Sequence, residues 1–109
     1  MKNKEFLRLV EEQFSKCRTI LRDKEKIYSI GQDRLARFYT ASVLTGLTPV
    51  QALLSMMAKH TVTIYDVANR ECEDIALWDE LITDLINYLL LLRALVEEEY
   101  NRQTKERST

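Results

Sequence analysis

The chain has 109 residues, of which 46% are hydrophobic and 30% are charged, and its formal net charge is -1. This length fits one domain, and this composition is typical of a globular rather than a disordered protein. A charge balance so close to zero predicts neither a nucleic-acid partner nor an anionic membrane partner.

Residues that break helices are rare: the chain has 2 glycines and 1 proline. We therefore predict an all-α fold with a single domain over residues 1–100 and a polar, disordered tail over residues 101–109. The longest apolar run, residues 85–92, is far shorter than the ~20 residues of a membrane span. Cys17 and Cys72 are too few for a disulfide framework, and no signal peptide is recognisable. Together these features predict a cytoplasmic protein with reduced thiols.

Four helices are expected in chain order, the first over about residues 3–27 and the second over about residues 33–44. Apolar side chains at steps of three and four predict the inward stripe of the first helix: Phe6, Leu9, Val10, Phe14, Cys17, Ile20 and Leu21. In the second helix the same pattern selects Leu35, Phe38, Tyr39 and Val43. Gly46 stands where a left-handed C-terminal cap is expected.

The third helix has the clearest start signal in the chain. Thr48 can cap it, Pro49 fits the first helical position, and Gln51 completes a capping box. This helix is expected to continue to about Asn69, with these residues facing inward: Leu53, Met56, Met57, His60, Ile64 and Val67. His60 is interpreted as a hydrogen-bonded core residue, since no second histidine is available for a metal site.

The fourth helix is expected to begin at Asp74 or Asp79 and to end at about Tyr100. Its apolar residues cover nearly the whole circumference, and a helix that is apolar all round must be surrounded by other elements. Three neighbours in so small a chain leave part of it uncovered. We therefore predict a homo-oligomer in which this helix packs across a symmetry axis.

A polar stripe interrupts this apolar helix. Glu80, Asp84 and Asn87 follow at steps of four and three, so they share one face, and Tyr88 lies beside them. A buried, ionised carboxylate needs a partner. Asp66 and Lys59 on the third helix are candidates: Asp66, Glu80 and Asp84 could together hold Mg²⁺, and Lys59 could contact a phosphate or neutralise Asp84. The structural alternative is an ordinary ion pair of Lys59 with Asp84 or Asp66, with Asn87 in an interhelical hydrogen bond.

Basic residues gather around the turn between the first two helices. Lys24, Lys26, Tyr28 and Arg34 lie there, and Arg37 follows one turn later. Lysine and arginine near a helix start can bind phosphate, and Tyr28 could stack on a base. The alternative is a solvated, charge-balanced surface, because Asp23, Glu25 and Asp33 are neighbours in the sequence.

The motif order resembles that of small phage and prophage proteins related to the all-α, MazG-like nucleotide pyrophosphohydrolases. The resemblance covers roughly residues 17–96. Its motifs are a KxKxY turn, an arginine–aromatic helix, a "TP" that opens a lysine-bearing helix, and the acidic segment "DELITDLINY", residues 79–88. The resemblance implies a four-helix, MazG-like bundle that assembles into dimers or tetramers. It also implies Mg²⁺-dependent hydrolysis of a nucleoside triphosphate to the monophosphate and pyrophosphate.

Carried over by position, Glu80 and Asp84 would be the acidic pair, and Lys59 would join them in catalysis. Lys24, Lys26, Tyr28, Arg34, Asn87 and Tyr88 would contact the nucleotide. The sequence departs from the family pattern, because the later helix has E-x-x-x-D where E-x-x-D is usual. In addition, Ser15 stands where E-E-x-x-E, begun by Glu11 and Glu12, would place its third acid.

Three functions therefore stay open. The first is an Mg²⁺-dependent nucleotide pyrophosphohydrolase. The second is a non-catalytic, phage-encoded binder, or decoy, that captures a nucleotide or a nucleotide-derived signal. The third is a structural helical oligomer whose polar stripe fixes the helix register. The missing carboxylate favours the binder over the enzyme.

Overall fold

The computed structural model of the protein describes residues 1–28 and 33–107, with no side chains described for residues 25–28. In these ranges the chain forms four helices and no β-strand, which confirms the all-α prediction. The helices are α1 (Asn3–Tyr28), α2 (Ala36–Thr45), α3 (Pro49–Asn69) and α4 (Ile75–Arg107).

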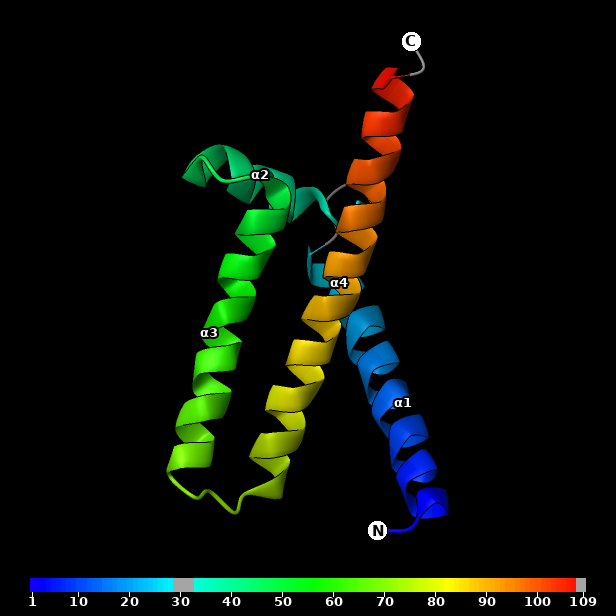
Figure 1. Ribbon diagram of the computed structural model, residues 1–109, viewed down its shortest axis with the longest axis vertical. Coiled ribbons are helices and arrows are strands. Elements are labelled where there is room, and N and C mark those ends of the chain that lie inside the picture. Colours follow the sequence, from blue (N-terminus) through cyan, green and yellow to red (C-terminus); the bar gives the residue numbers. More distant parts are fainter. Residues whose placement is uncertain (29–32, 108–109) are drawn as a thin grey trace.

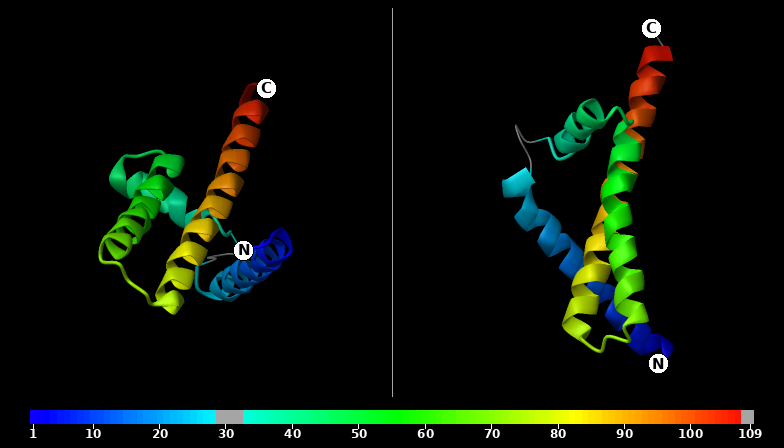
Figure 2. Two further views of the ribbon diagram at one scale, coloured as in Figure 1. Left: turned by 60° about the horizontal axis from the view of Figure 1, so that its bottom comes forward. Right: turned by 90° about the vertical axis from the view of Figure 1, so that its left-hand side faces the viewer.

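Helices α3 and α4 form an antiparallel hairpin, to which the other two helices attach separately (Figure 1). α2 lies across the start of α3, at 94° to it. α1 lies on the other side of α4 and diverges from it toward its own C-terminal end (Figure 2). Within the described ranges no single helix is long and apolar enough to cross a membrane, although the bent pair α2–α3 passes that test by length and composition.

The start of α3 has the predicted capping box. The Thr48 hydroxyl accepts a hydrogen bond from the Gln51 backbone N–H at 3.1 Å, and the Gln51 side chain accepts one from the Thr48 N–H at 3.0 Å. Gly46 ends α2 in the left-handed region with φ 75°, as predicted. α2 begins at Ala36 instead of Asp33, whose carboxylate accepts a hydrogen bond from the Leu35 N–H at 2.9 Å.

The hydrophobic core lies where α2, the first half of α3 and the second half of α4 meet. Leu53 and Leu95 are 0% exposed, and Leu35 and Phe38 are buried with them. The predicted inward position of Val43 is wrong: its side chain is 84% exposed, because the last turn of α2 carries it away from this core. Leu53 and Val67 of α3 are buried as predicted.

α4 continues to Arg107, so residues 101–107 are helical where the sequence predicted a disordered tail. Ion pairs along the helix support this extension, since Arg102 lies 3.8 Å from Glu98 and 3.9 Å from Glu99. The Arg102 guanidinium also stacks over the ring of Tyr39 in α2, at 4.7 Å from its centroid. The last turns are therefore tied both to their own helix and to α2.

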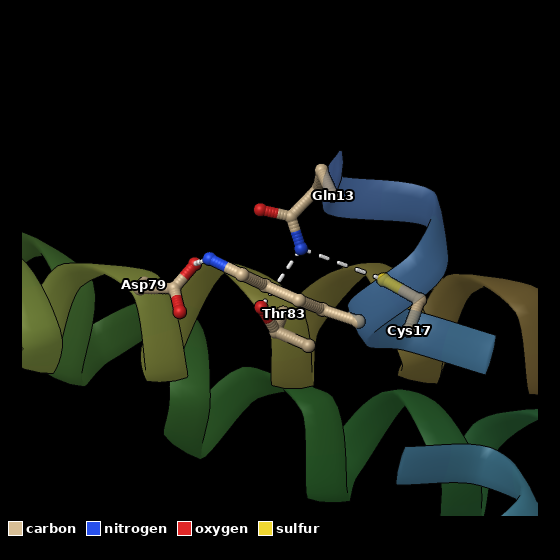
Figure 3. Close-up of polar contacts among 5 residues, drawn as sticks. Gln13, Cys17, Asp79 and Thr83 are labelled. Carbon is tan, nitrogen blue, oxygen red and sulfur yellow. Dashed lines mark hydrogen bonds and ion pairs between the residues drawn. The ribbon is translucent and has the colours of Figure 1, made fainter. Parts of the chain in front are cut away.

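α1 attaches to α4 through polar side chains (Figure 3). The amide of Gln13 donates to the hydroxyl of Thr83 at 2.8 Å, and Lys16 pairs with Asp79 at 3.0 Å. Thr83 and Cys17 are buried at this contact. Cys17 and Cys72 are not paired with each other. α1 thus reaches α4 without joining the apolar core of the other three helices. The predicted inward stripe of α1 is therefore wrong at Phe6, Leu9 and Phe14, which are 49%, 48% and 50% exposed.

Candidate functional site

A cavity of about 150 Å³ lies between the second half of α1, which diverges from α4, the start of α2, and helices α3 and α4. All four helices contribute to its wall, together with the residues just before α2. The lining side chains are Leu21, Lys24, Arg34, Arg37, Phe38, His60, Asp84, Asn87, Tyr88 and Leu91.

Helix α4 contributes the polar floor of this cavity. Asp84, Asn87, Tyr88 and Leu91 follow at helical steps and therefore share one face, as the sequence pattern predicted for the first three. Asp84 is half-buried there. Asp84 and Asn87 are therefore the two residues of the predicted polar stripe that line the cavity.

Asn87 is the most unusual polar residue of the site. Its side chain is 6% exposed, and neither its amide nitrogen nor its amide oxygen has a hydrogen-bond partner among the described residues. Leaving a buried polar atom unpaired costs about 1–3 kcal/mol. A ligand that presents one acceptor and one donor to this amide would satisfy both atoms.

Among the described residues that line the cavity, the basic side chains outnumber the acidic ones. Lys24, Arg34 and Arg37 are there together with the carboxylate of Asp84. Arg34 Nη2 donates to the carbonyl oxygen of Leu21 at 2.6 Å, which fixes this guanidinium at the end of α1. Arginine forms strong charge-assisted hydrogen bonds with phosphate, so these side chains suit an anionic ligand.

Two aromatic rings form another part of the wall. The rings of His60 in α3 and Tyr88 in α4 lie 4.9 Å apart between centroids and are tilted by 49°. Both are half-buried and both line the cavity. Such rings give a planar ligand a surface on which to pack, beside the amide of Asn87.

The structure brings together four of the residues predicted to bind a nucleotide: Lys24, Arg34, Asn87 and Tyr88. The other two, Lys26 and Tyr28, have side chains that lie outside the described residues. The sequence interpretation missed His60, which it assigned to the core, and left Arg37 out of the site. Arg37 had a usable signal, because it follows Arg34 by three residues and so shares its side of the chain.

The predicted catalytic and metal-binding residues are not gathered in this way. Lys59 and Asp66 are exposed on α3, and neither lines the cavity. Ion pairs among the described residues join Lys16 to Asp79, Arg93 to Glu97, and Arg102 to Glu98 and Glu99, so Lys59 is in none of them. The alternative of a Lys59 ion pair with Asp84 or Asp66 is therefore wrong.

Glu80 lies outside the cavity although it precedes Asp84 by one turn. It lines a second, more open groove between α1 and α4, together with Lys16, Asp79 and Thr83. α1 crosses α4 at this level, so the two carboxylates face different spaces. In the described ranges no three acidic, histidine or cysteine side chains lie close enough to hold a metal ion. Glu80, Asp84 and Asp66 therefore do not form the three-carboxylate Mg²⁺ site that the sequence suggested.

No protein-family model, no curated protein and no solved structure matches this chain. The relationship to MazG-like proteins stays a prediction from the sequence motifs.

Proposed function

We propose that this chain binds a nucleotide in the cavity between its helices and does not hydrolyse it. The observation that carries the proposal is the buried, unpaired amide of Asn87 in a cavity lined by Lys24, Arg34 and Arg37. A nucleotide is a ligand with a planar, hydrogen-bonding end and an anionic end, and these residues offer a partner to each.

The planar end is assigned to the α4 side of the cavity. An asparagine amide can pair with a donor and an acceptor on the edge of a nucleobase. Tyr88 and His60 lie beside it as packing surfaces, and the Asp84 carboxylate can accept from an amino group, a ring N–H or a sugar hydroxyl. Inorganic phosphate has no planar face to pack on these rings, and its negative charge would be repelled by Asp84.

The anionic end is assigned to the basic side of the cavity. Lys24 comes from the last two turns of α1, Arg34 from the residues just before α2, and Arg37 from α2. The volume of about 150 Å³ is below the ~300–1,000 Å³ of most small-molecule sites, so only one end of a nucleotide can be enclosed. The base is therefore placed inside and the phosphate at the basic rim.

Isothermal titration calorimetry with nucleoside monophosphates and triphosphates of each base, and with inorganic phosphate, tests this proposal. We expect wild-type binding that Asn87→Asp weakens by about 10- to 100-fold, because the change removes a donor and adds a charge, an effect of roughly 1.5–3 kcal/mol. Asn101→Asp makes the same chemical change at an exposed position of α4 and should leave binding unchanged. Circular dichroism of each variant checks that it folds.

Each of the remaining outcomes is informative. If no nucleotide binds, or if inorganic phosphate binds as tightly as the best nucleotide, the proposal is wrong. Release of pyrophosphate from a triphosphate in the presence of Mg²⁺, lost in Asp84→Ala, would instead establish the pyrophosphohydrolase and overturn binding without turnover. Arg34→Gln against the exposed Arg70→Gln tests the basic rim with a matched pair of changes.

A further inference from the structure

Two polar side chains of α4 line the cavity next to each other. Asn87 follows Asp84 by three residues, a step that places neighbouring side chains roughly 5–6 Å apart on one helix face. The Asn87 amide has a donor, Nδ2, and an acceptor, Oδ1, whereas the Asp84 carboxylate has acceptor oxygens and no donor. Together they offer one donor and two acceptors to the edge of a bound base.

Neither side chain is already engaged by the described residues. Both polar atoms of the Asn87 amide lack a hydrogen-bond partner there, and the side chain is 6% exposed. The ion pairs between described residues do not include Asp84, which is half-buried at the cavity. A base that leaves one of these groups unmatched in the bound state is penalised, so the pair can discriminate between bases.

Guanine has the complementary pattern. Along its Watson–Crick edge lie the O6 acceptor, the N1–H donor and the 2-amino donor. Asn87 Nδ2 would donate to O6 and Asn87 Oδ1 would accept from N1–H, so that one amide pairs with another. The Asp84 carboxylate would accept from the 2-amino group in a charge-assisted hydrogen bond.

The other common bases each leave the carboxylate unmatched. Uracil and thymine pair with the Asn87 amide through O4 and N3–H, but they turn the O2 carbonyl toward Asp84. Cytosine and adenine can pair with the amide when the amide is turned over. Cytosine then presents its O2 carbonyl to Asp84, and adenine presents a C–H. Guanine differs because it has two neighbouring donors on this edge.

We infer that the nucleotide bound in this cavity carries guanine, and that Asn87 and Asp84 together recognise the base. The inference rests on the proposed nucleotide binding and adds the identity of the base. Tyr88 and His60 can pack against any base, so they supply affinity while the two α4 side chains supply the discrimination.

Calorimetric titration with guanosine, inosine and xanthosine monophosphates tests this assignment. At position 2 of the purine, guanosine has an amino group, inosine a hydrogen and xanthosine a carbonyl oxygen. We expect guanosine monophosphate to bind the wild type about 10- to 100-fold more tightly than inosine monophosphate, because the hydrogen bond to a charged group is lost. Xanthosine monophosphate should bind more weakly still, since its oxygen would face the carboxylate.

Asp84→Asn should weaken this preference. An amide at residue 84 can donate to the xanthosine carbonyl, so the ratio of guanosine to xanthosine monophosphate affinity should fall at least about 10-fold. Asp66→Asn makes the same change at an exposed position of α3 and should keep the wild-type ratio. Circular dichroism checks that both variants fold.

The outcomes separate this inference from the proposed function. If no nucleotide binds, both are wrong. If binding depends on Asn87 but guanosine monophosphate is not preferred over inosine and adenosine monophosphates, nucleotide binding stands and guanine recognition is overturned. A folded Asp84→Asn protein with the wild-type ratio would also overturn it. If that variant does not fold, the order of the wild-type affinities decides alone.

Discussion

Helix α4 is packed by different chemistry on its two sides. Against α3 the contact is apolar and includes Leu53 and Leu95, both fully buried. Against α1 the described interactions are the Gln13–Thr83 hydrogen bond and the half-exposed Lys16–Asp79 ion pair, with Cys17 beside them. Burial of apolar surface stabilises a fold more than such polar contacts do, so the α3–α4 contact should dominate the free energy of unfolding.

Among changes that test the two sides of α4, Leu95→Ala is expected to have the largest effect on the free energy of unfolding. This change leaves a cavity in the core and should lower the free energy of unfolding by about 2–5 kcal/mol. Leu90→Ala removes the same atoms from a side chain that is 42% exposed and should cost less than about 1 kcal/mol. Urea unfolding followed by circular dichroism measures both, and equal losses would contradict the assignment of the core.

A smaller effect is expected on the α1 side. Thr83→Val keeps the shape of the side chain but removes the acceptor of the Gln13 hydrogen bond, so we expect a loss of about 1 kcal/mol. Combining it with Gln13→Leu gives a double-mutant cycle that isolates the pair. Thr63→Val, at an exposed site of α3, is the control. A loss as large as that of Leu95→Ala would mean that the two sides of α4 contribute equally.

The smallest effect concerns pH at the contact between α2 and α4. Burial, followed by the neighbouring Glu99 and Glu98 carboxylates, raises the pKa of Tyr39 from 10.0 to about 12. The phenol must then stay neutral in the folded protein, so its contribution to stability is complete below pH 10.0 and is lost as the pH rises toward about 12.

The free energy of unfolding of Tyr39→Phe should therefore fall less than that of the wild type between about pH 9.5 and about pH 11.5. This range covers roughly the beginning and the larger part of the titration of Tyr39. Tyr65→Phe removes an exposed phenol, 68% accessible, and should follow the wild-type pH profile. Thermal unfolding at several pH values measures the slopes. Parallel slopes for wild type and Tyr39→Phe would show that this phenol is not perturbed.

Local sequence signals predicted the helices well because their causes are local. The capping box at Thr48, the left-handed Gly46 and the apolar periodicity of α3 all depend on neighbouring residues. The helical extension to Arg107 could not be predicted in this way, because Arg102 gains part of its support from Tyr39, far away in the sequence. The exposed Val43 has a similar cause, since its surroundings depend on where α2 ends relative to α3.

The site was predictable to the extent that it follows one helix face. The steps between Asp84, Asn87 and Tyr88 placed them together, and the predicted turn cluster included Lys24 and Arg34, which line the same cavity. Glu80 obeys the same spacing, yet the crossing of α1 over α4 assigns it to another groove. Helical spacing predicts on which face of its helix a residue lies. The path of the neighbouring helix determines whether that face lines the cavity or another groove.

The cavity takes Leu21 and Lys24 from α1, the helix held to α4 by polar contacts. Binding of a ligand in the cavity and docking of α1 against α4 are then thermodynamically linked. A ligand that binds only when α1 completes the cavity wall would stabilise the docked position of α1. By the same linkage, a change that loosens the Gln13–Thr83 contact would weaken binding in the cavity without touching the ligand.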